Sequence, residues 1–381
     1  MIVCDVVKNS IWYDPRVKKQ IQSYIENGCE LFCVGLREAR YNEEEVKKIP
    51  GKVKIVDIDQ KYYSEKRNLF TKIIREIIIN KRVSKAILEI KPEVIHANDL
   101  DSLIPAYKAA KKLKCKLIYD SHEIFLENPW IASNKPVKFI WSFYEKRLIK
   151  KIDAMVCVSY AAAEYFAKEY KIPTPMVITN CSLKSEQCIQ DVKNPGFEVL
   201  NHGQFYVGRG YDIMVEASQY LKDYPEIKLA LRGFGVMEQQ LRNRADALKA
   251  DNVIFYPKVL VEELIPYASR SMVGVAITEA ICLNFKLSVS NKLFEYASAG
   301  LPVIMSDIPE HRYLNEKYNF GIVLEDNSPE TFAKAVIKLY TDRSFYDCCA
   351  ENAKKMSDEV NWETEFGRLI QAEYEMQGTM V

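Results

Sequence analysis

Short runs of apolar, β-branched residues alternate along this chain with longer segments whose apolar positions repeat at the helical period. In the first half the short runs predict strands at 1–7, 29–36, 52–58, 93–99, 116–122 and 154–160. In the second half they predict strands at 197–203, 227–235, 252–258, 272–278, 301–307 and 321–326. The longer segments between them, such as 17–27 and 102–113, predict helices. This alternation indicates βαβ units with right-handed crossovers, and therefore a parallel sheet in each half.

A polar segment at residues 183–196 interrupts the alternation and ends in Pro-Gly. With 381 residues, the chain is also longer than one hydrophobic core commonly supports. We therefore predict two doubly wound, Rossmann-like α/β domains at residues 1–190 and 191–360, which face each other across a cleft. A further helix is expected within residues 361–381.

The composition, 48% hydrophobic and 28% charged, is that of a soluble globular protein. No apolar run reaches the roughly 18–20 residues that span a bilayer, and the opening residues predict a strand and not a leader peptide. The ten cysteines form no CxxC pair and predict reduced, mostly buried thiols. We therefore expect the protein to work in the cytoplasm.

Charge is distributed unevenly between the two halves. Residues 1–190 hold 33 Lys and Arg against 24 Asp and Glu, which leaves 20 against 28 in the remainder. The basic first half predicts an anionic partner or surface, and no basic aromatic motif or zinc-finger spacing points to nucleic acid. Residues 134–152 place aromatic among basic side chains, which predicts peripheral contact with anionic lipid at the inner face of the cell membrane. A core-packed helix with a solvated basic face is the alternative.

Doubly wound sheets bind ligands beyond the carboxyl ends of their strands, so the loops that follow strands are candidate sites. In the second half, the loop 202–212 contains three glycines and Arg209 just before a predicted helix. Glycines allow close backbone approach, and an arginine near a helix N-terminus favours a phosphate group. A glycine-rich turn with a solvated arginine is the alternative. The loop 231–241, with Gly233 and Gly235, is similar and is equally consistent with a plain βα turn.

A later helix carries a glutamate within an otherwise soft apolar sequence, NKLFEYASAG. Ser290 or Asn291 can cap this helix, which places the amides near Lys292 and Leu293 at its positive end. That end can hold a diphosphate, while Glu295, one turn further on, can accept hydrogen bonds from a vicinal diol such as a ribose. The alternative is an i,i+3 ion pair between Lys292 and Glu295, worth a few tenths of a kcal/mol.

Polar residues end two consecutive strands of the first half: His96, Asn98, Asp99, Asp101, Asp120, Ser121, His122 and Glu123. Histidines and carboxylates at strand ends are candidates for acid–base chemistry, and we single out His122, Asp99 and Glu123. The alternative is that the aspartates cap helices and the histidines are structural. The spacings match no standard zinc pattern, so we predict no metal site.

Several of these segments together resemble a known family. DPRVKKQ, EVIHANDLDS, YDSHEI, HGQFYVGRGYD, LRGFGVMEQQL and SNKLFEYASAGLPVIMSDIPE resemble the GT-B glycosyltransferases, specifically the retaining family 4 of nucleotide-sugar-dependent enzymes. The resemblance runs over nearly the whole chain. The NKLFEY-type helix before a Gly-Leu-Pro-Val strand is its most specific part.

This resemblance implies that Glu295 binds the nucleotide ribose, that Arg209 binds the diphosphate, and that His122 contacts the transferred sugar or the acceptor. It also implies that the last helix crosses back to the first domain. The expected reaction retains the anomeric configuration and needs no metal or other cofactor, because Arg209 and helix dipoles neutralise the leaving group. The other expected donor-binding residues are Gly203, Gly233, Gly235, Tyr256, Lys258, Glu279, Asn291, Lys292 and Leu293.

The chain departs from the family pattern at two positions. Leu287 stands where many members carry a second glutamate, and Gln204 stands where an arginine is frequent. We expect a glycosyltransferase for a cell-surface polysaccharide or glycolipid, with a nucleotide-sugar donor and an anionic or lipid-linked acceptor. A sugar-nucleotide epimerase of the same fold and a non-catalytic two-domain binding protein are the alternatives.

Overall fold

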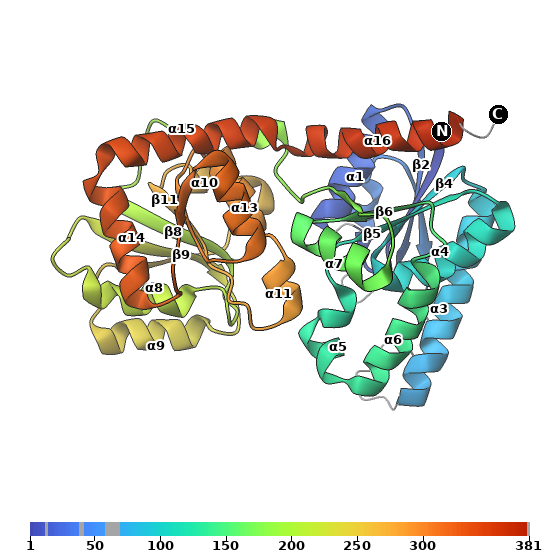
Figure 1. Ribbon diagram of the computed structural model, residues 1–381, viewed down its shortest axis with the longest axis horizontal. Helices are drawn as coiled ribbons and strands as arrows, with labels where there is room; N and C mark the ends of the chain where they lie inside the picture. The colour runs from blue at the N-terminus through green and yellow to red at the C-terminus, as the bar shows by residue number, and fades with distance from the viewer. Residues whose placement is uncertain (12–13, 38–41, 58–68, 379–381) are drawn as a thin grey trace. The chain divides into compact units, whose positions relative to one another are not determined.

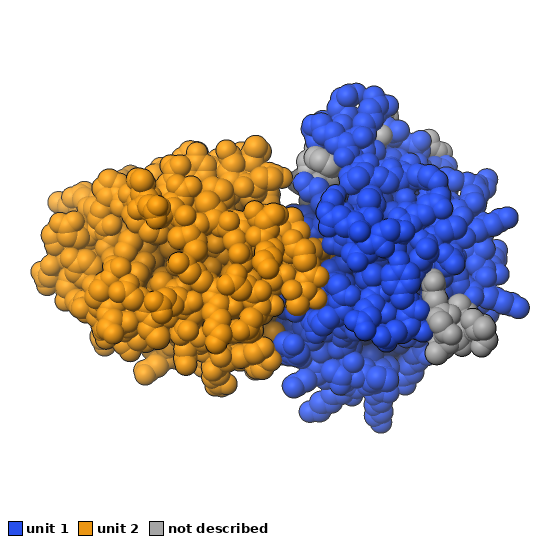
Figure 2. Space-filling view, turned by 90° about the horizontal axis from the view of Figure 1, so that it is seen from above, with its two compact units in different colours: residues 1–179, 365–381 blue, residues 180–364 orange. Residues whose placement is uncertain are grey.

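The structure, a computed structural model, describes residues 1–11, 14–37, 42–57 and 69–378. It divides the chain into two compact units, residues 1–179 with 365–381 and residues 180–364 (Figure 2). The boundaries expected from the sequence were after 190 and after 360. The end of the C-terminal helix belongs to the first unit, so the expected return of this helix to the first domain is confirmed.

Within its described residues, the first unit contains a seven-stranded parallel sheet in the order β3-β2-β1-β4-β5-β6-β7 (Figure 1). The strands are β1 Ile2–Val6, β2 Glu30–Leu36, β3 Lys52–Val56, β4 Val94–Asn98, β5 Lys116–Ser121, β6 Ala154–Cys157 and β7 Met176–Val177. The helices are α1 Pro15–Glu26, α2 Glu43–Lys47, α3 Leu69–Ile90, α4 Asp99–Leu113, α5 Pro129–Ser133, α6 Lys135–Leu148 and α7 Tyr160–Tyr170. The six predicted strands are confirmed, and the two-residue β7 was too short to show a pattern.

The second unit contains a six-stranded parallel sheet in the order β10-β9-β8-β11-β12-β13. Its strands are β8 Phe197–Gln204, β9 Ile227–Phe234, β10 Val253–Tyr256, β11 Val273–Ala276, β12 Val303–Met305 and β13 Gly321–Val323. Its helices are α8 Tyr211–Ala217, α9 Glu238–Leu248, α10 Leu264–Ala268, α11 Leu283–Leu287, α12 Asn291–Ser298, α13 Pro309–Tyr318, α14 Pro329–Thr341 and α15 Arg343–Glu359. The last helix, α16 Trp362–Gly378, starts in this unit and continues into the first.

The strand order creates one reversal point in each sheet. In the first unit, β1 lies beside β4, and in the second unit, β8 lies beside β11. Parallel sheets collect ligand-binding residues beyond the carboxyl ends of the strands at such reversal points. Asn98 is in register with Asp120 at the ends of β4 and β5, which brings the polar loops of the first unit to one edge.

Burial follows from the architecture. Because helices cover both faces of a parallel sheet, its strands are buried along their whole length, as seen in β4 and β11. Gly274 in β11 allows the ring of Tyr296 to lie directly on the strand, at a place that a Cβ atom would occupy. All ten cysteines are free thiols and most are buried, as expected. No helix in the described part of the chain is long and apolar enough to cross a bilayer.

We expect Gly274→Ala to destabilise the second unit by about 1–3 kcal/mol, because the added methyl group forces the Tyr296 ring away from the strand. Thermal and urea unfolding of the full chain measure this effect. Gly367→Ala, in α16 with open space around its Cα, is the matched control and should raise stability by up to about 1 kcal/mol. Equal effects of both substitutions would contradict the packing argument.

Candidate functional site

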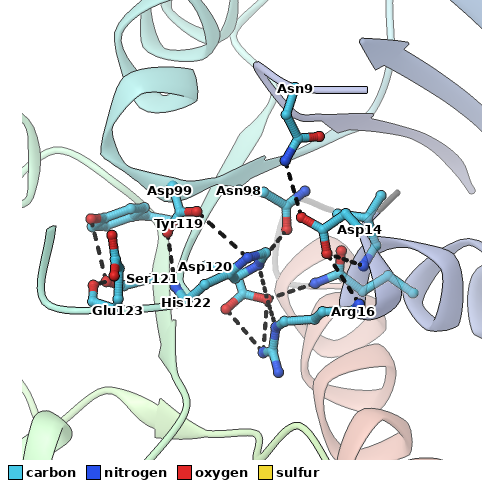
Figure 3. A network of polar contacts seen from close by, with 12 residues as sticks. Asn9, Asp14, Arg16, Asn98, Asp99, Tyr119, Asp120, Ser121, His122 and Glu123 are labelled. Carbon is cyan, nitrogen blue, oxygen red and sulfur yellow. Dashed lines mark hydrogen bonds and ion pairs between the residues drawn. The ribbon is translucent and has the colours of Figure 1, made fainter. Parts of the chain in front are cut away.

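A buried ion pair organises the polar edge of the first sheet (Figure 3). Asp14 caps α1 by accepting hydrogen bonds from the backbone amides of Arg16 and Val17. This cap starts the helix so that the Arg16 guanidinium reaches the end of β5. There its Nε and Nη2 atoms donate to the two oxygens of Asp120 at 2.9–3.0 Å, and Nη1 donates to the Ile178 carbonyl at 2.9 Å.

Asp120 is an anion in this setting. Its side chain is fully buried, which by itself would raise its pKa. The Arg16 charge outweighs burial, and together with the neighbouring histidines it holds the pKa of Asp120 well below its usual value. The edge of the sheet therefore carries the ionised Asp120 carboxylate, which is held in place by hydrogen bonds from the Arg16 guanidinium.

His122 lies between three polar groups at this edge. Its Nε2 is 3.0 Å from Asn98 Oδ1 and 3.8 Å from Asp120 Oδ2, and its Nδ1 is 3.5 Å from Asp99 Oδ2. The Asn98 amide nitrogen donates to Asp5, so its oxygen faces His122 and accepts from Nε2–H. Burial and the Arg16 charge lower the pKa of His122, against the effect of Asp120, which makes the ring neutral near pH 7.

The Nδ1 atom of this neutral ring then carries a lone pair that faces Asp99. Burial, followed by repulsion from Asp101 and Glu123, raises the pKa of Asp99 well above its usual value. A protonated Asp99 can donate to that lone pair, so the 3.5 Å contact brings together two neutral groups. Asp99 also has a φ of 63°, a strained backbone conformation that occurs preferentially at functional sites.

The other residues predicted in this region have different surroundings. The Glu123 carboxylate accepts from the Asn128 amide at 3.1 Å. His96 is fully buried and is held by Tyr24 and Asp120, which fits the structural alternative for this histidine. Among the residues that the structure describes, no group of three or more His, Cys, Asp or Glu could hold a metal ion.

In the second unit, a pocket of about 350 Å³ opens at the carboxyl end of β8, lined by Gln204, Tyr206, Arg209, Phe285 and Lys292. The Arg209 guanidinium lies over the Phe285 ring at 4.3 Å and donates from Nη1 to Thr278 Oγ1 at 3.2 Å. Two cationic side chains therefore share one pocket with the exposed Gln204.

Lys292 reaches this pocket from the first turn of α12. Its Nζ donates to Asn201 Oδ1 at 2.6 Å and lies 3.4 Å from the Tyr211 hydroxyl. Asn201 also donates to the Arg209 carbonyl, which ties the two cationic segments together. Burial and the Arg209 charge lower the pKa of Lys292 to about 7, against the effect of Glu295. Lys292 is thus only partly charged near neutral pH, whereas an arginine such as Arg209 stays protonated.

Glu295 lies one turn further along α12. Its Oε2 atom is 2.6 Å from Nε2 of His202, and its side chain is 24% exposed. His202 is buried, and its ring lies 4.6 Å from that of Tyr296. One carboxylate oxygen is thus oriented by a buried ring, and the carboxylate remains reachable from solvent.

The predicted glycines have a structural reason of their own. Gly203 and Gly233 have φ angles of 119° and 150°, and a Cβ on Gly233 would collide with the Gly203 carbonyl. Gly235 likewise lies against the backbone of Phe205. These residues allow the ends of β8 and β9 to approach each other. Gly203 also borders the pocket, because a Cβ there would lie 3.6 Å from Cε of Lys292.

The remaining donor-side candidates are spread over the unit. The Tyr256 hydroxyl donates to Glu198 at 2.9 Å and its ring packs on Arg232, while Lys258 is exposed over the Phe234 ring. The backbone of Glu279 donates to Gly208, next to the glycine loop. At the start of α12, Asn291 is exposed, whereas the Leu293 side chain is core and its amide donates to the Ser290 carbonyl at 3.1 Å.

Our sequence reasoning missed Arg16, Tyr24, Asn201, His202 and Glu373. One signal was present for Arg16: a basic residue in the first turn opposes the helix dipole and so indicates a specific partner. Lys292 has the same kind of position. For the other residues the partner is distant in sequence, and no local pattern marks them.

Solved structures match the whole chain at low sequence identity. Sucrose-phosphate synthase from Thermosynechococcus elongatus aligns with a TM-score of 0.76 and 14% identity over 100% of both chains. HepE of Anabaena, in complex with UDP and glucose, aligns with a TM-score of 0.74 and 13% identity over 98% of this chain and 99% of that one. The two parallel-sheet units therefore have the fold of the GT-B glycosyltransferases, as expected.

Two family models match the chain, Glycosyltransferase Family 4 over residues 17–181 and Glycosyl transferases group 1 over residues 189–356. Together they cover both units. The chain therefore contains these two glycosyltransferase domains, and the resemblance of its sequence motifs to the family 4-like glycosyltransferases is confirmed.

Curated relatives agree with this family. A protein in the cps region of Klebsiella pneumoniae is 31% identical over 36% of this chain and 42% of its own length. An uncharacterized glycosyltransferase of Methanocaldococcus jannaschii is 25% identical over 65% of each chain. One from Haemophilus influenzae is 22% identical over 83% of this chain and 84% of its own length. The match thus spans less than two thirds of the first two relatives.

We expect Asp120→Asn to destabilise the first unit by about 3–5 kcal/mol at neutral pH, because it leaves Arg16 buried beside an uncharged group. The folded-state pKa of Asp120 is depressed, so its stabilising effect is full above the unfolded pKa of about 4 and is lost as the pH falls through the folded value. The difference between the two proteins should therefore shrink in acid. Urea unfolding at several pH values measures it.

Asp307→Asn is the control, since Asp307 pairs with Arg312 at the exposed surface. This substitution should change stability little. A loss for Asp120→Asn no larger than that of the control would contradict the role given to the buried pair.

Proposed function

We propose that this protein transfers a sugar from a nucleotide-sugar to an acceptor hydroxyl, with retention of the anomeric configuration. The observation that carries the proposal is that Arg209 and Lys292 line one pocket at the carboxyl end of the second sheet, with Glu295 one turn further along the same helix as Lys292. The bound UDP in the structurally similar HepE supports a nucleotide-sugar as the donor.

In this proposal the pocket holds the donor diphosphate. Arg209 and Lys292 offer charge-assisted hydrogen bonds to it, and the N-terminus of α12 adds its dipole. Ser290 makes no side-chain cap to that helix in the described structure, which leaves its end open to a ligand. Glu295, oriented by His202, accepts from the ribose hydroxyls.

The charge state of Lys292 makes the pocket responsive to an anion. With its pKa near 7 in the free protein, the ammonium is partly deprotonated at neutral pH. A diphosphate beside it favours the charged form, so Lys292 takes up a proton as the donor binds. Protonated Lys292 then provides a second positive charge beside Arg209, which stabilises the negative charge of the leaving diphosphate.

Chemistry follows from this arrangement. The bond between the anomeric carbon and the phosphate oxygen breaks, and the electron pair leaves with the nucleoside diphosphate. The positive groups stabilise that charge, which is why we propose that no metal is required. The acceptor oxygen forms the new glycosidic bond on the same face, and its proton passes to the leaving phosphate. In the first unit, His122 and Asp99 supply neutral hydrogen-bonding groups for the sugar or the acceptor.

The acceptor is proposed to be anionic or lipid-linked, in a pathway that makes a cell-surface polysaccharide or glycolipid. The first unit carries the excess of basic residues, and α6 exposes Phe139 by 75% and Phe143 by 57%. The exposed Trp130 of α5 precedes them, and Lys146 and Arg147 lie in the last turn of α6. Exposed aromatic rings beside basic side chains fit the interface of an anionic membrane.

We expect Arg209→Ala to weaken binding of the matching nucleotide-sugar by about tenfold or more, because a charge-assisted hydrogen bond contributes about 1.5–3 kcal/mol. A panel of nucleotide-sugars, screened by thermal stabilisation and calorimetry, first finds that donor. Glu295→Gln should weaken binding of the nucleotide-sugar but hardly affect inorganic diphosphate, because only the ribose contact is changed.

Arg312→Gln, an exposed arginine of the same unit, is the control and should bind as the unmodified protein does. If no nucleotide-sugar stabilises the protein, or if Arg209→Ala binds the identified donor unchanged, the proposal fails. Turnover of the donor to an epimer without any acceptor would favour the epimerase instead.

We expect the double variant Phe139→Ser/Phe143→Ser to bind phosphatidylglycerol vesicles at least about tenfold more weakly, since burying one such ring contributes about 1.5–3 kcal/mol. Co-sedimentation measures this, with phosphatidylcholine vesicles as the uncharged comparison. Val236→Ser removes an equally exposed apolar residue from the second unit and should have no effect. Equal binding of all three proteins would remove the membrane from the proposal.

A further inference from the structure

A continuous chain of buried hydrogen bonds joins the C-terminal helix to the polar edge of the first sheet. The Tyr24 hydroxyl is 2.6 Å from Glu373 Oε1 and 2.7 Å from His96 Nδ1. On the other side of the imidazole, Nε2 is 3.3 Å from Asp120 Oδ2. All four side chains have no exposed surface. This series of hydrogen bonds thus links Glu373 of α16, through Tyr24 of α1 and His96 of β4, to the Asp120 carboxylate beside His122.

The Tyr24 hydroxyl has only one proton for its two short contacts. Burial and the nearby Glu373 raise the pKa of Tyr24, so the hydroxyl stays protonated. If it donates to Glu373, then the carboxylate is ionised and His96 must donate from Nδ1 to the tyrosine oxygen. If it donates to His96, then Glu373 must itself be protonated and donate to the tyrosine oxygen.

The protonation of Nε2, on the other side of the His96 ring, is the same in both arrangements. Asp120 is held as an anion by Arg16, so an unprotonated Nε2 at 3.3 Å would set a lone pair against a carboxylate. Nε2 therefore carries a proton in both arrangements. The Gln20 amide nitrogen donates to the same Asp120 oxygen at 2.7 Å and lies 3.4 Å from His96 Nε2.

The two arrangements contain the same number of protons. In one, Glu373 is an anion and His96 an imidazolium; in the other, both are neutral. Conversion between them moves one proton from His96 Nδ1 to the tyrosine oxygen while the tyrosine proton moves to Glu373. No bond to Asp120 is broken, and no other reactant is needed.

We propose that Glu373, Tyr24 and His96 hold one shared proton, and that Glu373 is thereby a positioning residue that keeps the His96 ring directed at Asp120. The C-terminal helix then does more than cover the first unit, because it sets the protonation of a ring that contacts the Asp120 carboxylate. The inference rests on the proposed function only in treating the Asp120–His122 edge as part of the reaction site.

The electrostatic setting matches a shared proton. Burial raises the pKa of Glu373 to about 7, whereas the pKa of His96 is raised by Asp120, Asp5 and Glu373 although burial opposes it. The two groups therefore compete for a proton in the same pH range, and they titrate as a pair. The titratable and charged groups that face them are Asp5 from β1, whose pKa burial raises to about 6, the Cys29 thiol before β2, Arg16 from α1 and Asp120 from β5.

Packing keeps water and alternative partners away from the three groups. Phe366, seven residues before Glu373 on α16, lies with its ring centroid 5.2 Å from that of Tyr24 and 6.4 Å from that of His96. The second carboxylate oxygen of Glu373, Oε2, is buried and has no hydrogen-bond partner among the residues that the structure describes. An ionised Glu373 with that oxygen unsolvated is costly, which keeps the neutral arrangement accessible.

The test uses nitrogen NMR of the full-length protein labelled at its four histidines, with His96 assigned by its substitution to Asn. In the unmodified protein we expect the His96 Nδ1 signal to stay constant across about pH 6 to 8, where one proton is shared, and Nε2 to remain protonated. In Glu373→Gln, His96 titrates alone. Its proton affinity falls about tenfold or more, because an opposite charge nearby is lost, and a titration step enters that interval.

Glu375→Gln, two residues further on the exposed side of α16, is the matched control and should keep the constant signal. Tyr24→Phe is the second test and should also produce the separate titration of His96, because the phenyl ring keeps its packing while the proton path is removed. If Glu373→Gln does not fold, this variant decides the question.

A His96 signal that titrates in the same way in the unmodified protein and in both variants would overturn the inference, as would an unprotonated Nε2. The measurement needs neither nucleotide-sugar nor acceptor. A failed donor screen therefore leaves it intact, and a negative NMR result leaves the proposed transfer intact.

Discussion

The buried contact between Arg16 and Asp120 is the interaction on which the first unit's polar edge depends. Removing two charges from water is costly, and a buried pair is weak support for overall stability. Its value here is geometric. Two parallel hydrogen bonds fix the carboxylate, and the fixed carboxylate lies 3.3 Å from His96 Nε2 and 3.8 Å from His122 Nε2. Loss of this pair would remove the fixed negative charge that lies beside both histidines.

The second unit also has a basic residue in the first turn of a helix, but within the described structure this residue has no carboxylate as its hydrogen-bond partner. Arg16 and Lys292 both lie in the first turn of a helix, where a positive charge opposes the dipole. Arg16 is compensated by an internal carboxylate. Lys292 instead contacts the neutral oxygen of Asn201 and lies close to the charge of Arg209. At the start of α1 the positive charge of Arg16 is therefore neutralised by a carboxylate. At the start of α12 the charge of Lys292 has only neutral hydrogen-bond partners in the described part of the chain, which favours the binding of an anion.

The C-terminal helix α16 has residues in both units and contacts the buried polar groups of the first unit. Trp362 at its start is fully buried and donates from its backbone to the Ser182 carbonyl in the second unit. Further along the helix, Phe366 and Glu373 pack over Tyr24 and His96 in the first unit. A helix that only closed a hydrophobic face would have no need of a buried carboxylate at position 373.

The sequence by itself determined the strands and the parallel βαβ topology, because strand and helix periodicities are local and a parallel sheet places its polar loops at one edge. The class of protein followed from the resemblance of its motifs to a known family. The sequence also identified His122, Asp99, Arg209, Lys292 and Glu295 as candidates, since each lies in a loop after a strand or in the first two turns of a helix. Only the tertiary structure decided which of these groups meet. The partners of Arg16 and Lys292 lie 104 and 91 residues away, and Tyr24 meets Glu373 across 349 residues. Such contacts leave no local pattern, because each depends on how strands and helices far apart in the chain are packed together.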